Sequence, residues 1–350
     1  MPLLFANQWI SGTVLKALCW TFIHSLWQGM VAAVVAGLII YCTRRSKPQL
    51  RYALLVFLFA LFILVTGATF LYQLSYVVSV HGPSALAPPA GSSVLLVADD
   101  GIIASGSTPG LLTRFTDYFN TNAALVVFAW ALVFMFKCVH ICTGLRYVHR
   151  LRKHNVYPAL DGWAVKTKEL AKRMGITRPI TLLQSATLHA PVTVGYMKAT
   201  ILVPLGLLAN LPPDQVEAVL LHELAHIRRK DYLVNLLQRF AETVFFFNPA
   251  ILWISSLIGQ EREAACDDLV LAHLPRQKAY FEALVSFQEY ALAHRGHAMA
   301  LLPHKQYLLG RIRRMITREN QKLNTMEKTM LLLGILVISA FGFISKQPVV

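Results

Sequence analysis

Long apolar runs are the dominant pattern along this chain of 350 residues. Four of them, residues 17–42, 52–78, 123–145 and 329–344, are long enough to cross a bilayer as helices. The last run is the shortest and would span with little tilt. The pattern therefore predicts an α-helical membrane protein with four transmembrane helices.

Between the third and fourth runs the pattern changes to shorter elements. A basic helix is expected over 146–153 and another over 163–174, which Gly175 ends. Short β-branched runs separated by turn residues then favour a small antiparallel sheet. These runs are residues 180–183, 192–196 and 200–203.

One of these strands is also a candidate for substrate binding. An exposed strand beside a catalytic helix can hold a peptide in extended form through main-chain hydrogen bonds. Residues 190–196 are the candidate for that edge, and an ordinary core strand is the alternative. Further on, residues 233–258 are apolar but interrupted, which favours two helices meeting at Asn248-Pro249 and packed in the domain or against the membrane surface.

Composition and charge set the topology. Hydrophobic residues make up 55% of the chain and charged residues 15%, as expected for a membrane protein with a soluble part. The basic residues cluster at the ends of the apolar runs, as Arg44, Arg45, Lys47, Arg51, Arg146, Arg150, Arg152, Lys153, Arg311, Arg313, Arg314, Arg318, Lys322 and Lys328. By the positive-inside rule, both termini lie outside and residues 146–328 are cytoplasmic. The net charge of +15 thus reflects topology, and direct nucleic-acid binding is not expected.

These boundaries divide the chain into five parts. Residues 1–78 hold the first two transmembrane helices, and residues 79–122 form a flexible extracytoplasmic loop rich in Gly, Ala, Pro, Ser and Thr. Residues 123–145 form the third transmembrane helix. Residues 146–328 form a cytoplasmic domain, and residues 329–350 the fourth helix with a short outer tail.

The candidate chemistry lies in the pentapeptide His222-Glu223-Leu224-Ala225-His226, within a segment that reads as helix. Histidines four residues apart lie on one helical face, so both imidazoles can reach one Zn²⁺. Glu223 is turned by about 100° around the helix axis and can address a water on the same metal. The motif predicts a zinc hydrolase site with Glu223 as the general base.

A zinc site of this class needs a third protein ligand, for which Glu263 is the candidate. Glu263-Ala264-Ala265-Cys266-Asp267 has the Glu-x-x-x-Asp spacing and lies in a predicted helix over 260–273. Asp267, one turn later, is placed to hold a ligating histidine by its second ring nitrogen. Glu261 is the rival ligand, on a different helical face from Asp267.

Several further motifs occur together with the zinc motif in a fixed order. They are Ser25-Leu26-Trp27-Gln28-Gly29, Pro191-Val192-Thr193-Val194-Gly195, Ile201-Leu202-Val203-Pro204, His226-Ile227-Arg228-Arg229-Lys230-Asp231, Phe247-Asn248-Pro249, Glu261-Arg262-Glu263-Ala264-Ala265-Cys266-Asp267 and Leu309-Gly310-Arg311-Ile312. With them the chain resembles the BlaR/MecR-type antirepressor membrane metallopeptidases, the family of bacterial beta-lactam sensor-transducers and their relatives.

The resemblance implies a bacterial inner-membrane protein with four spans and a cytoplasmic α+β zinc metallopeptidase domain of the gluzincin class. It implies that His222, His226 and Glu263 hold Zn²⁺ and that Glu223 is the catalytic base. In the family, an outer sensor switches the peptidase, which cleaves itself and relieves repression of target genes. The expected partners are a cytoplasmic transcriptional repressor, acted on directly or indirectly, and membrane lipid; a homodimer is left open.

Some features stay open at this level. A sensor module normally follows the last span in the family, whereas this sequence ends at Val350, so either a sensor has been removed or something else reads the outer signal. The penicillin-binding function is not carried over, because this sequence has no residues for its Ser-x-x-Lys chemistry. The segment 294–306 is either the site of self-cleavage or an ordinary linker. A second donor to the reaction's oxyanion is expected from a His, Tyr or Arg. The sequence does not identify it, since the candidates Tyr232, Arg262 and His273 are all equally consistent with surface or packing roles.

Three functions remain in view. The first is a signalling protease whose action changes transcription. The second is a housekeeping membrane protease of the HtpX or prenyl-peptidase type, against which the four-span order and the Phe-Asn-Pro segment argue. The third is a non-catalytic membrane scaffold that keeps the site for structure.

Overall fold

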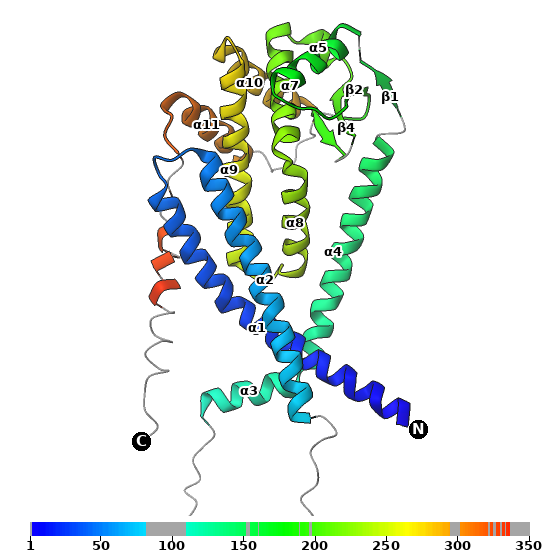
Figure 1. Cartoon of the computed structure of the whole chain (residues 1–350), viewed down its shortest axis with the longest axis vertical. Helices are drawn as coiled ribbons and strands as arrows, with labels where there is room; N and C mark the ends of the chain where they lie inside the picture. The colour runs from blue at the N-terminus through cyan, green and yellow to red at the C-terminus, as the bar shows by residue number, and fades with distance from the viewer. Residues whose placement is uncertain are drawn as a thin grey trace, which may run out of the picture. The chain divides into compact units, whose positions relative to one another are not determined.

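The computed structural model of the chain is mostly helical (Figure 1). It forms two compact units, Met1–Met30 with Leu61–Lys137 and Val31–Ala60 with Cys138–Val350. The described residues are 2–81, 110–151, 155–159, 161–188, 190–195, 198–294, 302–320, 323–324, 327–329, 331–332 and 334–336.

Three helices among the described residues are long and apolar enough to cross a membrane. They belong to α1 (Pro2–Cys42), α2 (Pro48–His81) and α4 (Ala123–Leu151). The apolar spans themselves are Gly12–Cys42, Pro48–Tyr76 and Ala123–Gly144, and they match the first three predicted spans. Large apolar side chains such as Phe57, Leu64, Phe128 and Phe136 are exposed along them, as a lipid-facing surface requires. The fourth predicted span, 329–344, lies largely outside the described residues.

The first unit contains a helix that composition did not predict. α3 (Leu111–Thr121) occupies the end of the segment expected to be a flexible loop, whose residues 82–109 lie outside the described part. Its aromatic residues recur at helical spacing, and the rings of Phe115 and Phe119 pack at a tilt of 51° with centroids 4.6 Å apart. Asn120 in α3 accepts a hydrogen bond of 2.8 Å from the Trp20 indole of α1. The Gly- and Pro-rich composition of the preceding segment hid this local apolar periodicity.

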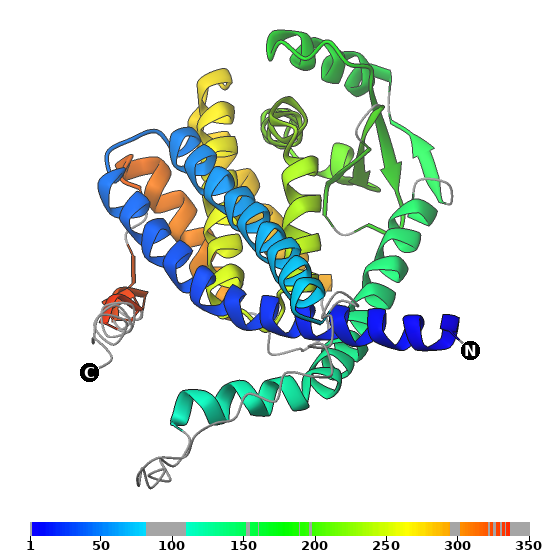
Figure 2. The same ribbon diagram turned by 60° about the horizontal axis from the view of Figure 1, so that its bottom comes forward.

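The second unit contains the end of α1, the start of α2, the end of α4 and all elements from β1 onward. The start of α2 lies against α9 (Pro249–His273), where Arg51 and Glu261 form an ion pair of 2.9 Å (Figure 2). α4 continues without a break to Leu151, so the predicted separate basic helix is the end of this long helix. The reason is that no proline or turn residue follows the apolar run, and the single Gly144 does not break it.

The sheet has four strands in the order β1-β2-β4-β3. β1 (Val156–Pro158) and β2 (Ile180–Ser185) are antiparallel, as are β3 (Val192–Val194) and β4 (Ala199–Pro204), whereas β2 and β4 are parallel. The predicted antiparallel sheet is therefore wrong in one pairing. β3 folds back outside β4 as a hairpin, which places β4 beside β2 in the same direction, and spatial order of this kind is not visible in strand patterns.

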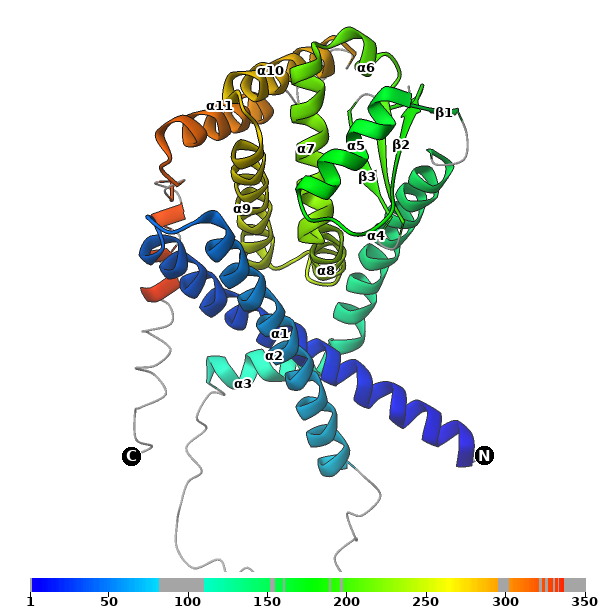
Figure 3. The ribbon, with the colours of Figure 1, turned by 45° about the horizontal axis from the view of Figure 1, so that its top comes forward.

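The helices around the sheet build one apolar core. α5 (Asp161–Arg173) ends as predicted at Gly175, where φ is +72° and the Ile176 N–H donates to the Ala171 carbonyl at 2.9 Å. α7 (Pro213–Arg229) lies between the sheet and α9 (Figure 3). It presents Val216, Leu220 and Leu224, which are fully buried, to this core. The polar side chains of α7 therefore project from the rest of its surface.

The segment after α7 forms two helices, as predicted. α8 (Asp231–Val244) precedes α9, and Asn248 caps α9 by accepting from the Ala250 N–H at 3.1 Å, with Pro249 in the first turn. The predicted helix over 260–273 is thus the second half of one long helix. α10 (Gln277–His294) and α11 (Leu302–Thr317) complete the unit, with the short α6 (Leu207–Asn210) before α7.

Candidate metal centre

The two motif histidines project from the same face of α7. Their Nε2 atoms are 3.3 Å apart, and the rings meet edge to face with centroids 4.8 Å apart. This is what a four-residue spacing on a helix produces, because successive positions of that spacing lie one turn apart. His222 and His226 therefore direct their Nε2 atoms at one point.

Glu263 of α9 completes the group. Its Oε2 lies 3.5 Å from the His222 Nε2 and its Oε1 lies 3.9 Å from the His226 Nε2. Burial raises the pKa of Glu263, but the hydrogen bond and charge of His222, the charge of His226 and Arg311 outweigh it, so the pKa lies well below its usual value. The carboxylate is thus held in its charged form.

The rival carboxylate of Glu261 lies on another face of α9. Its Oε1 pairs with the Arg51 guanidinium at 2.9 Å, and both side chains are almost fully buried. Burial raises the pKa of Glu261, and the charges of Arg51 and Arg314 oppose that rise. The structure therefore brings Glu263, and not Glu261, to the two rings.

Asp231 orients the ring of His226. The Nδ1 of His226 donates to the Asp231 Oδ2 at 2.9 Å, and Lys230, with φ of +59°, turns the chain from α7 into α8 so that Asp231 comes back toward the ring. Burial disfavours a charged His226, but its hydrogen bonds to Asp231 and Cys266 raise its pKa well above the usual value. The Cys266 thiol lies 3.4 Å from both partners, and burial raises the pKa of Cys266 to about 11. This thiol is therefore neutral.

Tyr280 of α10 orients the ring of His222. Its hydroxyl lies 2.9 Å from the His222 Nδ1 and donates to the Asp267 Oδ1 at 2.6 Å, so it accepts from an Nδ1–H on the ring. Asp267 itself is 3.9 Å from that nitrogen, which is too far for a hydrogen bond. Asp267 therefore lies beside His222, as predicted. Its contact with the ring runs through the Tyr280 hydroxyl and is not direct.

This arrangement fits a divalent metal ion. Both Nδ1 atoms face oxygen atoms of other residues, so the two Nε2 atoms, 3.3 Å apart, are the ring atoms left to face a metal ion. Two nitrogens bound to one tetrahedral Zn²⁺ would lie about 3.4 Å apart. Imidazole nitrogen and carboxylate oxygen are also ligands that Zn²⁺ accepts. The donor set of His222, His226 and Glu263, whose ligand atoms all lie within 4.8 Å of one another, passes this test.

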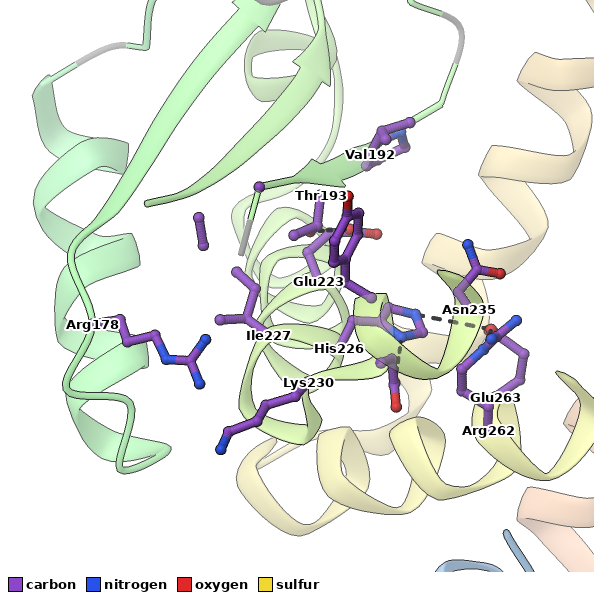
Figure 4. Close-up of a pocket in the computed structure, with 15 residues that line it drawn as sticks. Arg178, Val192, Thr193, Glu223, His226, Ile227, Lys230, Asn235, Arg262 and Glu263 are labelled. Atoms are coloured by element: carbon purple, nitrogen blue, oxygen red, sulfur yellow. Dashed lines mark hydrogen bonds and ion pairs between the residues drawn. The ribbon is translucent and has the colours of Figure 1, made fainter. Parts of the chain in front are cut away.

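Glu223 lies beside these residues on the wall of a pocket of about 300 Å³ (Figure 4). The hydroxyl of Thr193 in β3 donates to the Glu223 Oε2 at 2.6 Å. Since β3 is an edge strand of the described sheet, the 192–194 part of the candidate substrate strand 190–196 lies at an edge. The pocket thus brings together a carboxylate, the centre and a strand edge.

The three candidates for the second oxyanion donor separate in the structure. Tyr232 and Arg262 line the pocket. The His273 Nδ1 lies 2.8 Å from the Leu269 carbonyl at the end of α9, and this residue is not among those that line the pocket. Tyr232 and Arg262 therefore remain candidates.

Sequence reasoning missed the residues that orient the histidines. Asp231, Thr193 and Arg311 lie within the motifs that carry the family resemblance, so the sequence marked these residues but did not indicate what they contact. Cys266 lies within the Glu263–Asp267 motif without a role assigned to it, and Tyr280 gave no such signal. A contact between distant helices, and not local pattern, brings Tyr280 to the centre.

Arg311 of α11 closes the network, and its removal should destabilise the fold. Its Nη2 donates to the Asp267 Oδ1 at 2.6 Å, where the Asp267 side chain is fully buried. Arg311→Gln leaves that charge without its cation, so the free energy of unfolding should fall by about 3–5 kcal/mol. Denaturation of the chelator-treated protein measures this, with the exposed Arg313→Gln as the matched control. An unchanged midpoint for Arg311→Gln would show that the ion pair does not support the fold.

Comparison with known proteins is consistent with this geometry. Residues 24–316 match the family described as BlaR1 peptidase M56, a range that contains every residue of the centre. The chain belongs to the BlaR1 peptidase M56 family. The family is described as one of peptidases, and the three apolar helices among the described residues are long enough to cross a membrane.

The matches to individual relatives cover smaller parts of this M56 chain than the family match does. It is 29% identical over 133 residues to the methicillin resistance mecR1 protein of Staphylococcus aureus strain Mu50, covering 37% of this chain and 22% of that protein. It is 32% identical over 110 residues to the regulatory protein BlaR1 of Bacillus licheniformis, covering 31% and 18%. A protease HtpX homolog of Aeropyrum pernix is 27% identical over 180 residues, covering 48% and 54%. The chain thus spans about a fifth of the length of the two regulatory relatives.

Proposed function

We propose that this chain is a zinc metalloendopeptidase of the gluzincin class, built as a cytoplasmic α+β domain on four transmembrane helices. The observation that carries the proposal is the convergence of two imidazoles and the Glu263 carboxylate, with Glu223 on the adjoining pocket wall. His222, His226 and Glu263 would hold Zn²⁺. Asp231 and the Tyr280–Asp267 pair would keep the two rings in the tautomer that binds metal.

The proposed reaction is peptide hydrolysis. When bound, the ion supplies Lewis-acid catalysis and makes water acidic enough to react near neutral pH. Glu223 accepts a proton from the attacking water and delivers it to the nitrogen of the leaving amine. Thr193 holds the Oε2 of Glu223, so the carboxylate keeps a fixed orientation during both transfers.

The substrate would bind along the edge of β3. An extended peptide can add to an exposed strand through main-chain hydrogen bonds, and the pocket continues from β3 to the centre. Tyr232 or Arg262, which both line the pocket, would supply the second donor to the developing oxyanion. A peptide carbonyl placed between these elements would be aligned for attack.

The proposed location is the bacterial inner membrane, with both termini outside and residues 146–328 in the cytoplasm. The support is the position of the basic clusters at the ends of the apolar spans. In this topology, residues 79–122 form an extracytoplasmic loop and residues 329–344 form the last span. Membrane lipid would surround the apolar helices. The topology is compatible with a monomer and with a homodimer.

The biological role we propose is signal transduction that ends in changed transcription, as in an antibiotic-resistance response. Proteins named for methicillin resistance and for regulation are among the relatives. The enzyme would act on a cytoplasmic transcriptional repressor, directly or by causing its loss, and would cleave itself within 294–306. Most of that segment lies outside the described residues, between α10 and α11.

A second candidate is a housekeeping membrane protease. The HtpX homolog of Aeropyrum pernix matches a larger share of both chains than the regulatory relatives do. In that case the substrates would be damaged or misfolded membrane proteins and not one repressor. A scaffold without catalysis is the third outcome that an experiment must separate.

The test compares cells that carry the active chain with cells that carry Glu223→Gln. For a signalling enzyme, the abundance of one DNA-binding protein falls on induction in the first cells only, and few other proteins change. Accumulation of many membrane proteins in the Glu223→Gln cells would instead favour quality control. Identical protein abundances in both cell types would leave only the scaffold.

A further inference from the structure

The start of the membrane helix α2 reaches both elements that carry the proposed metal ligands. Arg51 and Tyr52 are consecutive residues near its N-terminal end, within the apolar span Pro48–Tyr76. Arg51 pairs with Glu261, two residues before Glu263 on α9, and the two side chains are 1% and 7% exposed. A buried ion pair of this kind is costly to break from one side, so it fixes α2 against α9.

Tyr52 makes the second connection, to the junction of α7 and α8. Its hydroxyl donates to the Asp231 Oδ1 at 3.2 Å, and the Arg229 guanidinium lies over its ring, 4.5 Å from the centroid. The other oxygen of Asp231 accepts from the His226 ring at 2.9 Å. A single carboxylate therefore joins a tyrosine of α2 to an imidazole of the centre.

The helix geometry explains how one turn serves both contacts. Neighbouring residues on a helix point about 100° apart, so Arg51 faces α9 while Tyr52 faces the α7–α8 junction. The two contacts together fix the rotation of α2 about its axis relative to both ligand-bearing elements. Ordinary packing would need only apolar contacts here, whereas these contacts end on charged groups beside the centre.

We infer that Tyr52 is a positioning residue, which holds Asp231 and through it the His226 ring, and that Arg51 anchors the same turn of α2 to α9. The inference rests on the proposed metal site. α2 is one continuous helix from Pro48 to His81, so a rotation of the helix would also rotate its start. Rotation of the start would move Tyr52 and so change the environment of His226. The apolar helix α2 is thus coupled to the metal centre.

Tyr52→Phe tests this inference with the removal of one hydroxyl. The full-length protein in detergent is loaded with Co²⁺, whose visible absorption reports ligand geometry, and the rate of metal loss to a chelator is followed. Outer-shell partners of metal ligands typically change metal affinity by about 10–100-fold, and we expect a change of about 3–10-fold because Tyr52 acts through Asp231. The matched control is Tyr72→Phe, an exposed tyrosine of the same helix.

The result that supports the inference has three parts. Tyr52→Phe shifts the Co²⁺ absorption and speeds metal loss, its thermal midpoint stays that of the wild type, and it has no further effect in an Asp231→Asn background. Such non-additivity is expected only if Tyr52 acts through Asp231. Tyr52→Phe behaving as Tyr72→Phe, or having the same effect with and without Asp231, would overturn the inference.

A reference variant separates failure of this inference from failure of the proposed metal site. Glu263→Gln must lose metal far faster than the wild type if the site is correct. If Glu263→Gln retains metal as the wild type does, the site is wrong and the inference falls with it. If only Tyr52→Phe is without effect, the site stands and the inference alone is overturned.

Discussion

Glu223→Gln is expected to reduce peptide hydrolysis by about 10²- to 10⁴-fold, because the amide cannot accept the proton of the attacking water. The change keeps the shape of the side chain and its position beside Thr193. Since Glu223 is not one of the three ligands, the protein should still bind metal. Cleavage of a peptide library by the purified full-length protein measures the rate, with metal content determined on the same sample.

The matched control for this variant is Glu217→Gln. Glu217 lies on the same helix, away from the pocket lining, and pairs with Lys166 and Arg173 at 3.9 and 3.6 Å. The control should cleave at the wild-type rate. Equal activity of wild type and Glu223→Gln would show that another group or a contaminating protease performs the hydrolysis.

The second large effect is loss of the metal when Glu263 is replaced. Glu263→Gln removes a charged ligand, so zinc affinity should fall by more than the roughly 100-fold that removal of an outer-shell partner can cause. Competition with a chelator of known affinity measures the change. Peptide hydrolysis should fall in parallel at limiting zinc and recover in part at high zinc.

Glu261→Gln is the control that the sequence itself offers. It has the same chemistry two residues away, but Glu261 pairs with Arg51 and not with the histidines. This variant should lose far less zinc affinity than Glu263→Gln and should unfold more easily, because Arg51 stays buried without its anion. If Glu261→Gln loses zinc and Glu263→Gln does not, the assignment of the third ligand is reversed.

The local parts of the centre were predictable from sequence. His222 and His226 lie four residues apart on one helix, and that spacing alone places both rings on one face. The Glu-x-x-x-Asp spacing favoured Glu263 over Glu261 as the third ligand. The structure adds the physical reason, since the face of α9 with Glu263 meets the histidines of α7 and the face with Glu261 meets Arg51 of α2.

The parts that sequence did not reveal depend on contacts between distant elements. Tyr280 stands between His222 and Asp267 because α10 packs on α7, and no local pattern encodes that packing. The same holds for Tyr52, which resembles any aromatic residue at the start of a membrane helix. The parallel pairing of β2 and β4 was missed for a related reason. Strand patterns indicate that a strand is present but not which strand lies beside it in the sheet.

The charges of the centre form one connected network. Arg311 pairs with Asp267, Asp267 accepts from Tyr280, and Tyr280 holds His222. On the other side, Tyr52 and Asp231 hold His226. Each ring is thus fixed from behind by a buried carboxylate, either directly or through one hydroxyl, which is the arrangement that leaves both Nε2 atoms available.

X-ray absorption at the zinc edge of the purified full-length protein tests the central claim most directly. The neighbouring His226, Asp231 and Cys266 could hold an ion as well, and that site would contain sulfur. The account predicts one zinc per chain with nitrogen and oxygen ligands at about 2.0–2.2 Å, including two imidazoles. A sulfur ligand at about 2.3 Å, or the lack of stoichiometric zinc, would contradict it.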